Sequence, residues 1–163
     1  MPKIYKKKMT KKDRLYSQKV NIADFSFGKE TAVVFDDMLL RSVPLYSELQ
    51  RMISEIANEF SITGTHVYDL GCSTGVTLQN LHQGIQKKVR FIGVDYSQAM
   101  LDLCKKNVSK LRDPRKCEYI CADLNQAIKG RNASVVVLNL TLQFVRPLCR
   151  DRLIQSIYTG LKK

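Results

Sequence analysis

Apolar runs alternate with helix-like segments along most of the chain. Four short runs rich in aliphatic and β-branched residues predict strands, and segments with apolar residues every three or four positions lie between them. Strands that alternate with helices in this way favour a parallel sheet with right-handed crossovers and helices on both faces. We therefore expect a doubly wound α/β domain. The four predicted strands are His66–Leu70, Val89–Asp95, Glu118–Ala122 and Ser134–Leu140.

The helices are predicted from the same periodicity and from residues that suit helix ends. The first helical pattern begins at Ser42, with Pro44 in its first turn, and is broken by Thr63-Gly64. Ser97 suits the N-cap of a later helix, and Pro147 lies near the start of the last one. The apolar positions are Leu45, Leu49, Met52, Ile53, Ile56 and Phe60, then Leu78, Leu81 and Ile85, then Met100, Leu103, Cys104, Val108 and Leu111, and finally Leu148, Ile154, Ile157 and Leu161.

Length and composition indicate one compact domain. The chain has 163 residues, of which 44% are hydrophobic, so it is too apolar to be disordered and too short for two ordinary domains. No stretch approaches the ~20 apolar residues of a membrane-spanning helix. The polar, lysine-rich N-terminus also lacks the apolar core of a secretory signal. We expect a cytoplasmic protein without a membrane segment.

The cysteines and histidines do not predict a metal site. Five cysteines and two histidines, without a Cys-x-x-Cys pair, cannot form a zinc site of ordinary spacing. Cys117 and Cys121 would face the same side of a strand, so a pair there is conceivable. Free thiols in a reducing compartment are the interpretation we favour.

Most of the positive charge lies at one end of the chain. The formal net charge is +12, and residues 1–20 hold eight basic side chains against one acidic side chain. The remainder carries a net charge of only +5, so the excess predicts a terminal arm rather than a basic face. Such an arm could steer an RNA or an acidic partner, or it could be a solvated tail. We favour the tail, with the α/β domain over residues 21–163.

The segment after the first predicted strand is the first candidate for chemistry. In doubly wound folds, ligands bind beyond the carboxyl ends of the strands. Residues 69–75 read DLGCSTG, which matches neither the dinucleotide fingerprint G-x-G-x-x-G nor a Walker A loop. A carboxylate at Asp69 would repel a pyrophosphate but would favour the ammonium and sulfonium of S-adenosylmethionine.

The next strands also end in polar residues that suit an adenosine. Asp95 ends the second strand, where a carboxylate can accept both ribose hydroxyls, although an Asp there could also cap the next helix. Asp123 follows the third strand and could accept from the adenine amino group, while Leu124 packs on the ring. Asn139, delivered by the fourth strand, borders the same cleft or is a plain loop residue.

Three blocks of sequence resemble one family. They are RSVPLYS at residues 41–47, VYDLGCS at 67–73 and NASVVVLNLTLQF at 132–144. From about Ala23 to Leu161 the chain resembles the carboxy-S-adenosyl-L-methionine synthase family of the S-adenosylmethionine methyltransferase superfamily. The resemblance implies a Rossmann-like sheet of the class I methyltransferase type.

The resemblance also implies a reaction and a set of contacts. The family converts S-adenosyl-L-methionine and prephenate to carboxy-S-adenosyl-L-methionine, which a second enzyme uses to modify a tRNA wobble uridine. It implies a homodimer in the full-length family, and direct tRNA binding is not expected. No catalytic residue is assigned. The implied contacts to S-adenosyl-L-methionine or its carboxylated form are Tyr46, Gly71, Cys72, Ser73, Asp95, Tyr96, Asp123, Leu124 and Asn139.

Two departures from the family pattern keep other functions open. Tyr96 stands where the family more often has a small polar residue. The chain also reaches Lys163 where the family turns into its fifth strand, so we expect a sheet lacking its C-terminal strands and the family's downstream arginine for the transferred carboxylate. The alternatives are an ordinary methyltransferase acting on a small molecule or RNA, and an inactive remnant that binds the cofactor.

Overall fold

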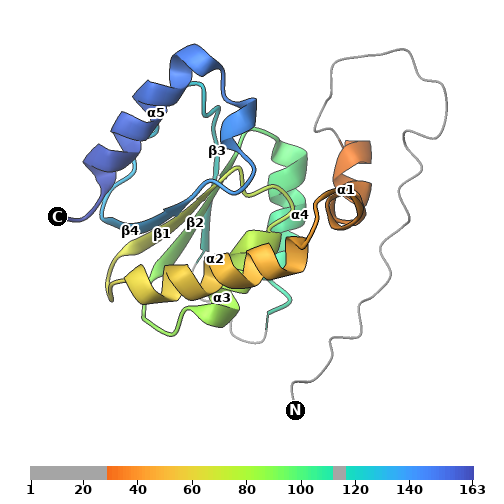
Figure 1. Ribbon diagram of the computed structural model, residues 1–163, viewed down its shortest axis with the longest axis horizontal. Helices are drawn as coiled ribbons and strands as arrows, with labels where there is room; N and C mark the ends of the chain where they lie inside the picture. Colours follow the sequence, from red (N-terminus) through yellow and green to blue (C-terminus); the bar gives the residue numbers. More distant parts are fainter. Residues whose placement is uncertain (1–28, 112–116) are drawn as a thin grey trace.

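The structure, a computed structural model, describes residues 29–111 and 117–163 and contains a four-stranded parallel sheet (Figure 1). The strand order is β3-β2-β1-β4, and β1 pairs in parallel with both β2 and β4. This confirms the predicted parallel α/β sheet. The basic arm predicted over residues 1–20 lies outside the described residues. The strands are β1 His66–Leu70, β2 Arg90–Asp95, β3 Cys117–Cys121 and β4 Ala133–Val137.

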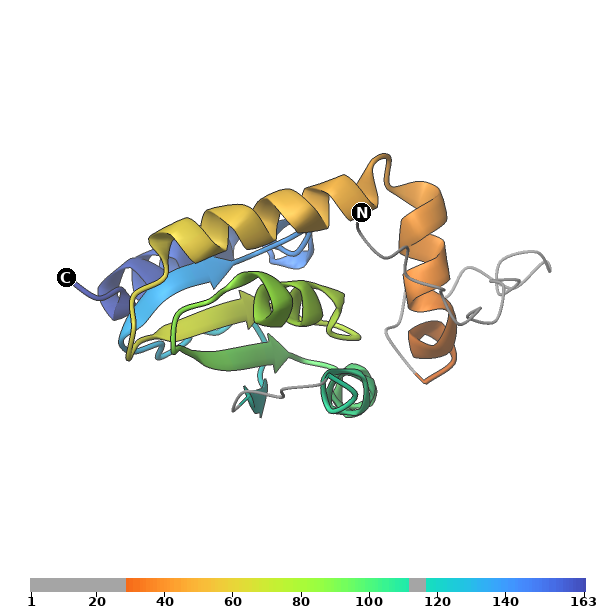
Figure 2. The same ribbon diagram turned by 90° about the horizontal axis from the view of Figure 1, so that it is seen from below.

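Helices cover both faces of this sheet. Figure 2 shows α2 and α3 on one side of the strands, and Figure 1 shows α5 on the other. None of the helices in residues 29–111 and 117–163 is long and apolar enough to cross a membrane. The helices are α1 Lys29–Ser42, α2 Tyr46–Phe60, α3 Val76–Gly84, α4 Gln98–Val108, the 3-10 turn η1 Leu142–Phe144 and α5 Pro147–Gly160.

Alternate residues of the central strands form two separate cores. Val67 and Phe91 are fully buried in the core shared with α2, α3 and α4. Their neighbours Tyr68 and Ile92 are buried in the core beneath α5, together with Leu153. Since successive side chains of a strand point to opposite faces, a strand buried on both faces reads as a continuous apolar run. This is why the strands could be recognised in the sequence.

Several predicted boundaries are wrong by a few residues. The helix predicted from Ser42 begins at Tyr46, because Pro44 lies in the turn between α1 and α2 and Leu45 adopts a left-handed conformation with φ 54°. The fourth strand ends at Val137 rather than Leu140. Leu161 lies outside α5 and instead forms a parallel bridge with Ala133.

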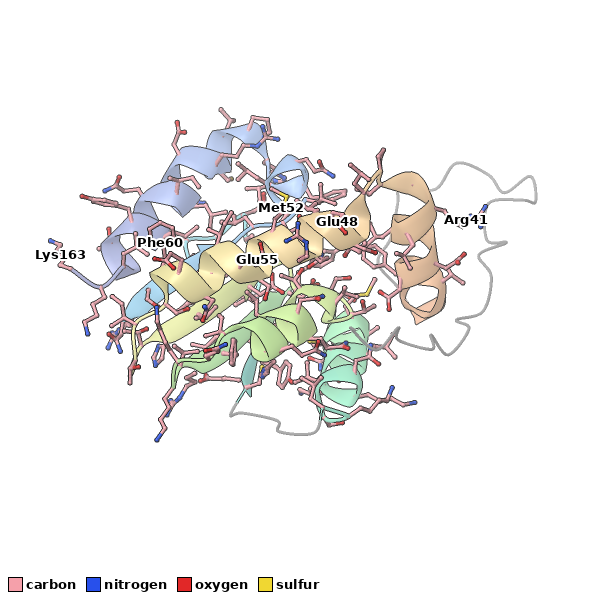
Figure 3. The ribbon with its side chains drawn as sticks, turned by 60° about the horizontal axis from the view of Figure 1, so that its bottom comes forward. Arg41, Glu48, Met52, Glu55, Phe60 and Lys163 are labelled. Atoms are coloured by element: carbon pink, nitrogen blue, oxygen red, sulfur yellow. The ribbon has the colours of Figure 1, made fainter. Side chains whose placement is uncertain are left out.

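The inner face of α2 is not the face that the sequence predicts. Met52 and Phe60 are 50% and 66% exposed, and Figure 3 shows them along the outward side of the helix with Glu48 and Glu55. Arg51 pairs with both of these glutamates. The buried stripe instead contains Tyr46, Gln50, Ser54 and Ala57. The buried face of α2 therefore includes polar side chains, and Ser54 contacts α3.

All five cysteines are free thiols. Cys117 and Cys121 lie at opposite ends of β3, so the pairing left open by the sequence is not formed.

Candidate cofactor-binding site

Two buried carboxylates lie at the carboxyl ends of β1 and β2. Asp69 is the fourth residue of β1 and is paired in register with Gly93, two residues before Asp95. Burial raises the pKa of Asp69 to about 7, and the charge of Asp95 adds to this shift. Burial also raises the pKa of Asp95, although backbone N–H groups that donate to it act in the opposite direction. The pair makes this edge of the sheet a favourable place for a cation.

Asp95 holds two loops together. Its Oδ2 accepts a hydrogen bond from the Ser73 backbone N–H at 2.9 Å, and its Oδ1 accepts one from the Ser97 backbone N–H at 2.9 Å. The Ser97 hydroxyl caps α4 by accepting from the Met100 N–H, as the sequence predicts. Because each carboxylate oxygen can accept more than one hydrogen bond, Asp95 retains acceptor capacity toward a ligand.

The loop between β1 and α3 is tightly folded. Gly71, Ser73 and Gly75 all have positive φ, at 81°, 50° and 89°. The backbone N–H groups of Gly71 and Cys72 both donate to the Val94 carbonyl, which binds the loop to the end of β2. For Ser73 the left-handed conformation is unfavourable, and such strain is concentrated at functional sites.

Substitution of Gly71 by alanine is expected to cost more stability than the same change at Gly64. Both glycines have φ 81°, but a Cβ on Gly71 would overlap the Thr141 side chain, whereas a Cβ on Gly64 would have nothing within 4 Å. We expect Gly64→Ala to lower the free energy of unfolding by about 1–2 kcal/mol, because of the backbone conformation alone. Gly71→Ala should lower it by about 1–3 kcal/mol more, because of the overlap with Thr141. Urea unfolding of both variants measures the difference. Equal losses would contradict the close approach of Thr141.

The first two helices close the site from the side. The Thr74 hydroxyl donates to the Asp36 carboxylate of α1, which holds α1 over the loop. Tyr46, in the first turn of α2, is buried, and burial raises its pKa to about 12, with further contributions from the charges of Asp36 and Asp69. Segments separated by more than thirty residues in the sequence therefore meet here.

The remaining predicted contact residues lie in different surroundings. Cys72 is buried in the core with Cys104, and Tyr96 is 55% exposed after β2. Asp123 accepts from the backbone N–H and the side-chain amide of Asn125, which makes a local turn. The other two predicted residues are Leu124, buried in the core beneath α5, and Asn139, half-buried two residues beyond β4.

Asp36, Gln50 and Thr141 lie beside the loop of residues 71–75 or beside Tyr46, but they were not singled out from the sequence. Thr141 lies within a block that the resemblance covers, next to the predicted Asn139. Asp36 has no local signal, because its hydrogen bond joins α1 to a loop 38 residues away. Gln50 lies outside the apolar positions of its predicted helix and would be interpreted from the sequence as facing solvent.

The chain matches the family model of a methyltransferase domain over residues 67–163. It is 49% identical over 154 residues to the carboxy-S-adenosyl-L-methionine synthase of Methylococcus capsulatus, covering 93% of this chain and 64% of that protein. It is 39% identical to the synthase of the same name from Shewanella sediminis, covering 94% and 63%. The chain thus spans slightly less than two thirds of the length of these curated relatives.

Solved structures share the fold. A candidate S-adenosyl-L-methionine-dependent methyltransferase from Methanococcus maripaludis superposes with a TM-score of 0.69 at 20% identity, covering 88% of this chain and 64% of that one. The glycopeptide N-methyltransferase MtfA, complexed with S-adenosyl-L-methionine, superposes with a TM-score of 0.54 at 15% identity, covering 69% and 50%. At these identities the likeness shows that the fold is of the class I methyltransferase type.

Proposed function

Because the chain belongs to the methyltransferase-domain family and is similar to carboxy-S-adenosyl-L-methionine synthases, we propose that it binds S-adenosyl-L-methionine at the carboxyl ends of β1 and β2. The observation that carries this proposal is the buried carboxylate pair, Asp69 and Asp95, beside the loop of residues 71–75. Within the described residues, Asp69 Oδ2 is buried without a hydrogen-bond partner. A cationic ligand would give this buried oxygen a charged partner.

The residues around this pair suit the parts of the ligand. Asp95 would accept the ribose hydroxyls, and the turn at Asp123 would bring a carboxylate to the adenine amino group. Leu124 would support the adenine ring from the core side. The remaining contacts in this proposal are Tyr46, the backbone of Gly71, Cys72 and Ser73, then Tyr96 and Asn139, with carboxy-S-adenosyl-L-methionine as the other occupant of the same site.

We further propose the synthase reaction named in the relatives. Prephenate would release its ring carboxylate as carbon dioxide and its hydroxyl as hydroxide, leaving phenylpyruvate. The methyl group of S-adenosyl-L-methionine would lose a proton, and the resulting carbanion would form a bond to the carbon dioxide. The proton and hydroxide give water, so atoms and charge balance. In this proposal the product serves the modification of a tRNA wobble uridine by a second enzyme in the cytoplasm, and the full-length protein is a homodimer that does not itself bind tRNA.

A chain extended by the part of the Methylococcus capsulatus relative that the match does not cover is expected to carry out this reaction more efficiently than the 163-residue chain. Asp69 and Asp95 already place two like charges together, and a third carboxylate beside them is unfavourable by several kcal/mol unless a cation pairs with it. The site residues named above include no cationic side chain. Mass spectrometry of the cofactor, after incubation with prephenate, measures the gain of one carboxyl group.

The other products of this experiment distinguish the alternatives. S-adenosylhomocysteine as the main product of the extended chain, formed with an RNA or amine acceptor, would indicate an ordinary methyltransferase. Binding without turnover in either chain would indicate an inactive cofactor-binding protein. Equal carboxylation by both chains would contradict the need for a further cation.

A further inference from the structure

Gln50 carries a buried amide on the inner face of α2, beside the Tyr46 hydroxyl. Its side chain is 2% exposed, and neither Nε2 nor Oε1 makes a hydrogen bond of good geometry within the described residues. Burial of an unpaired amide is unfavourable, so such groups are rare in folded proteins and call for an explanation. Its neighbour one turn further along the same stripe, Ser54, has a partner, because its hydroxyl donates to the Asn80 carbonyl of α3.

The position of Gln50 places it next to the proposed ligand site. Figure 2 shows α2 running opposite to β1, so the N-terminal end of α2 lies at the carboxyl edge of the sheet. Tyr46 is in the first turn there, and Gln50 follows one turn later, ~6 Å along the axis. Burial raises the pKa of Tyr46, a contact from the Gln50 side chain partly offsets this rise, and the charge of Asp69 adds to it.

Two buried polar groups without a well-formed hydrogen bond therefore lie near Tyr46. Gln50 comes from α2 and Asp69 Oδ2 from β1, and both are more than nine-tenths buried. A carboxylate alone could recognise a cation. A carboxamide has two donor hydrogens, which can donate to a negatively charged group. A carboxamide and a carboxylate together therefore suit a ligand that carries one negative and one positive group.

We propose that Gln50 determines specificity for the amino-acid end of S-adenosyl-L-methionine, donating from Nε2 to its carboxylate while Asp69 receives its ammonium. This inference rests on the proposed function. It accounts for an amide with no well-formed hydrogen bond at a buried position of α2. The adenosine part of the ligand, bound at Asp95, is not affected by this contact.

The test compares three probes that share an adenosine. S-adenosyl-L-methionine and S-adenosylhomocysteine carry the amino-acid end, and 5′-methylthioadenosine lacks it. Calorimetry on Gln50→Leu is expected to show a Kd at least tenfold higher for the first two and within twofold of wild type for the third. The matched control is Ser54→Ala, which removes a polar group from the same buried stripe one turn further from Tyr46 and should leave all three Kd values unchanged.

The melting temperature of the ligand-free protein adds a second readout. Because leucine replaces an unpaired amide, Gln50→Leu is expected to raise the melting temperature, whereas loss of a structural hydrogen bond would lower it. Should Gln50→Leu fail to fold, Gln50→Met provides a flexible apolar replacement for the same three measurements.

Each outcome decides between distinct conclusions. Equal weakening of all three probes, or no weakening of any, would overturn the role of Gln50 while leaving the proposed function in place. Binding of none of the probes by the wild-type chain would overturn the proposed function and this inference with it. Weaker binding of only the two probes that carry an amino-acid end would support both the proposed function and the role of Gln50.

Discussion

Asp95→Ala is expected to weaken the binding of S-adenosyl-L-methionine by about 2–4 kcal/mol, roughly 30- to 1000-fold, because the ribose hydroxyls lose charge-assisted hydrogen bonds. The same change removes the acceptor of the Ser73 and Ser97 backbone N–H groups, so part of the loss comes from the loop. Calorimetry measures the total effect. The domain should also prefer S-adenosyl-L-methionine to NAD, since carboxylates at the site repel a pyrophosphate.

A pair of simpler ligands separates the two contributions. Wild-type protein should bind adenosine more tightly than 2′-deoxyadenosine, and Asp95→Ala should abolish this preference, whereas loop damage alone would weaken both equally. The control is Asp102→Ala, which removes an exposed carboxylate from α4 that accepts from Gln98 and lies outside the site. Tighter binding of NAD, or an unchanged Kd in Asp95→Ala, would contradict the assignment.

The sheet was predictable because its strands are buried on both faces. His66–Leu70 was predicted with the observed bounds. The predicted bounds of the other three strands differ from the observed ones by one to three residues at one or both ends. The grouping of the acids at the strand ends was predictable for a different reason, because the carboxyl ends of parallel strands share one edge of the sheet. Asp69 and Asp95 do lie together there, with the loop of residues 71–75 between them.

The first two helices were not predictable to the same degree. The apolar periodicity of α2 includes Met52 and Phe60, which are exposed in the structure, while Gln50 and Ser54 are buried. Local periodicity identifies a helix but not which face tertiary contacts cover. The α1 helix was missed altogether, although its Phe35 packs on Met100 of α4 and its Asp36 accepts from Thr74. These contacts join distant segments, so no short window of sequence contains them.

Raising the pH is expected to destabilise the ligand-free protein between about pH 4 and pH 7. Burial raises the pKa of Asp69 to about 7 in the folded state, whereas an unfolded chain releases this proton near pH 4. The folded state therefore holds more protons in this window, and its free energy of unfolding falls as the pH rises, by up to about 4 kcal/mol for a shift of this size. Asp95, whose pKa is also raised, contributes with the same sign, and Tyr46 stays neutral throughout.

Asp69→Asn removes most of this pH dependence. The variant should be more stable than wild type at pH 8 and nearly equal to it at pH 4, as measured by urea unfolding at both pH values. Asp151→Asn, an exposed change on α5, should leave the wild-type profile in place. A wild-type stability that rises from pH 4 to pH 7 in parallel with that of Asp69→Asn would contradict the raised pKa.

The same ionisation should favour the ligand. Because a cation should bind the charged form of Asp69, the affinity of wild-type protein for S-adenosyl-L-methionine is expected to rise as the pH approaches 7 and to level off above it. The affinity for uncharged 5′-methylthioadenosine should change little. Asp69→Asn should bind S-adenosyl-L-methionine about 10- to 100-fold more weakly at pH 8, as one charged partner is lost. A carboxylate that serves a cationic ligand should destabilise the empty site and strengthen the complex, whereas a buried acid that serves only the fold should show no gain in affinity for the cation. The opposition of these two effects would therefore distinguish the two roles for Asp69.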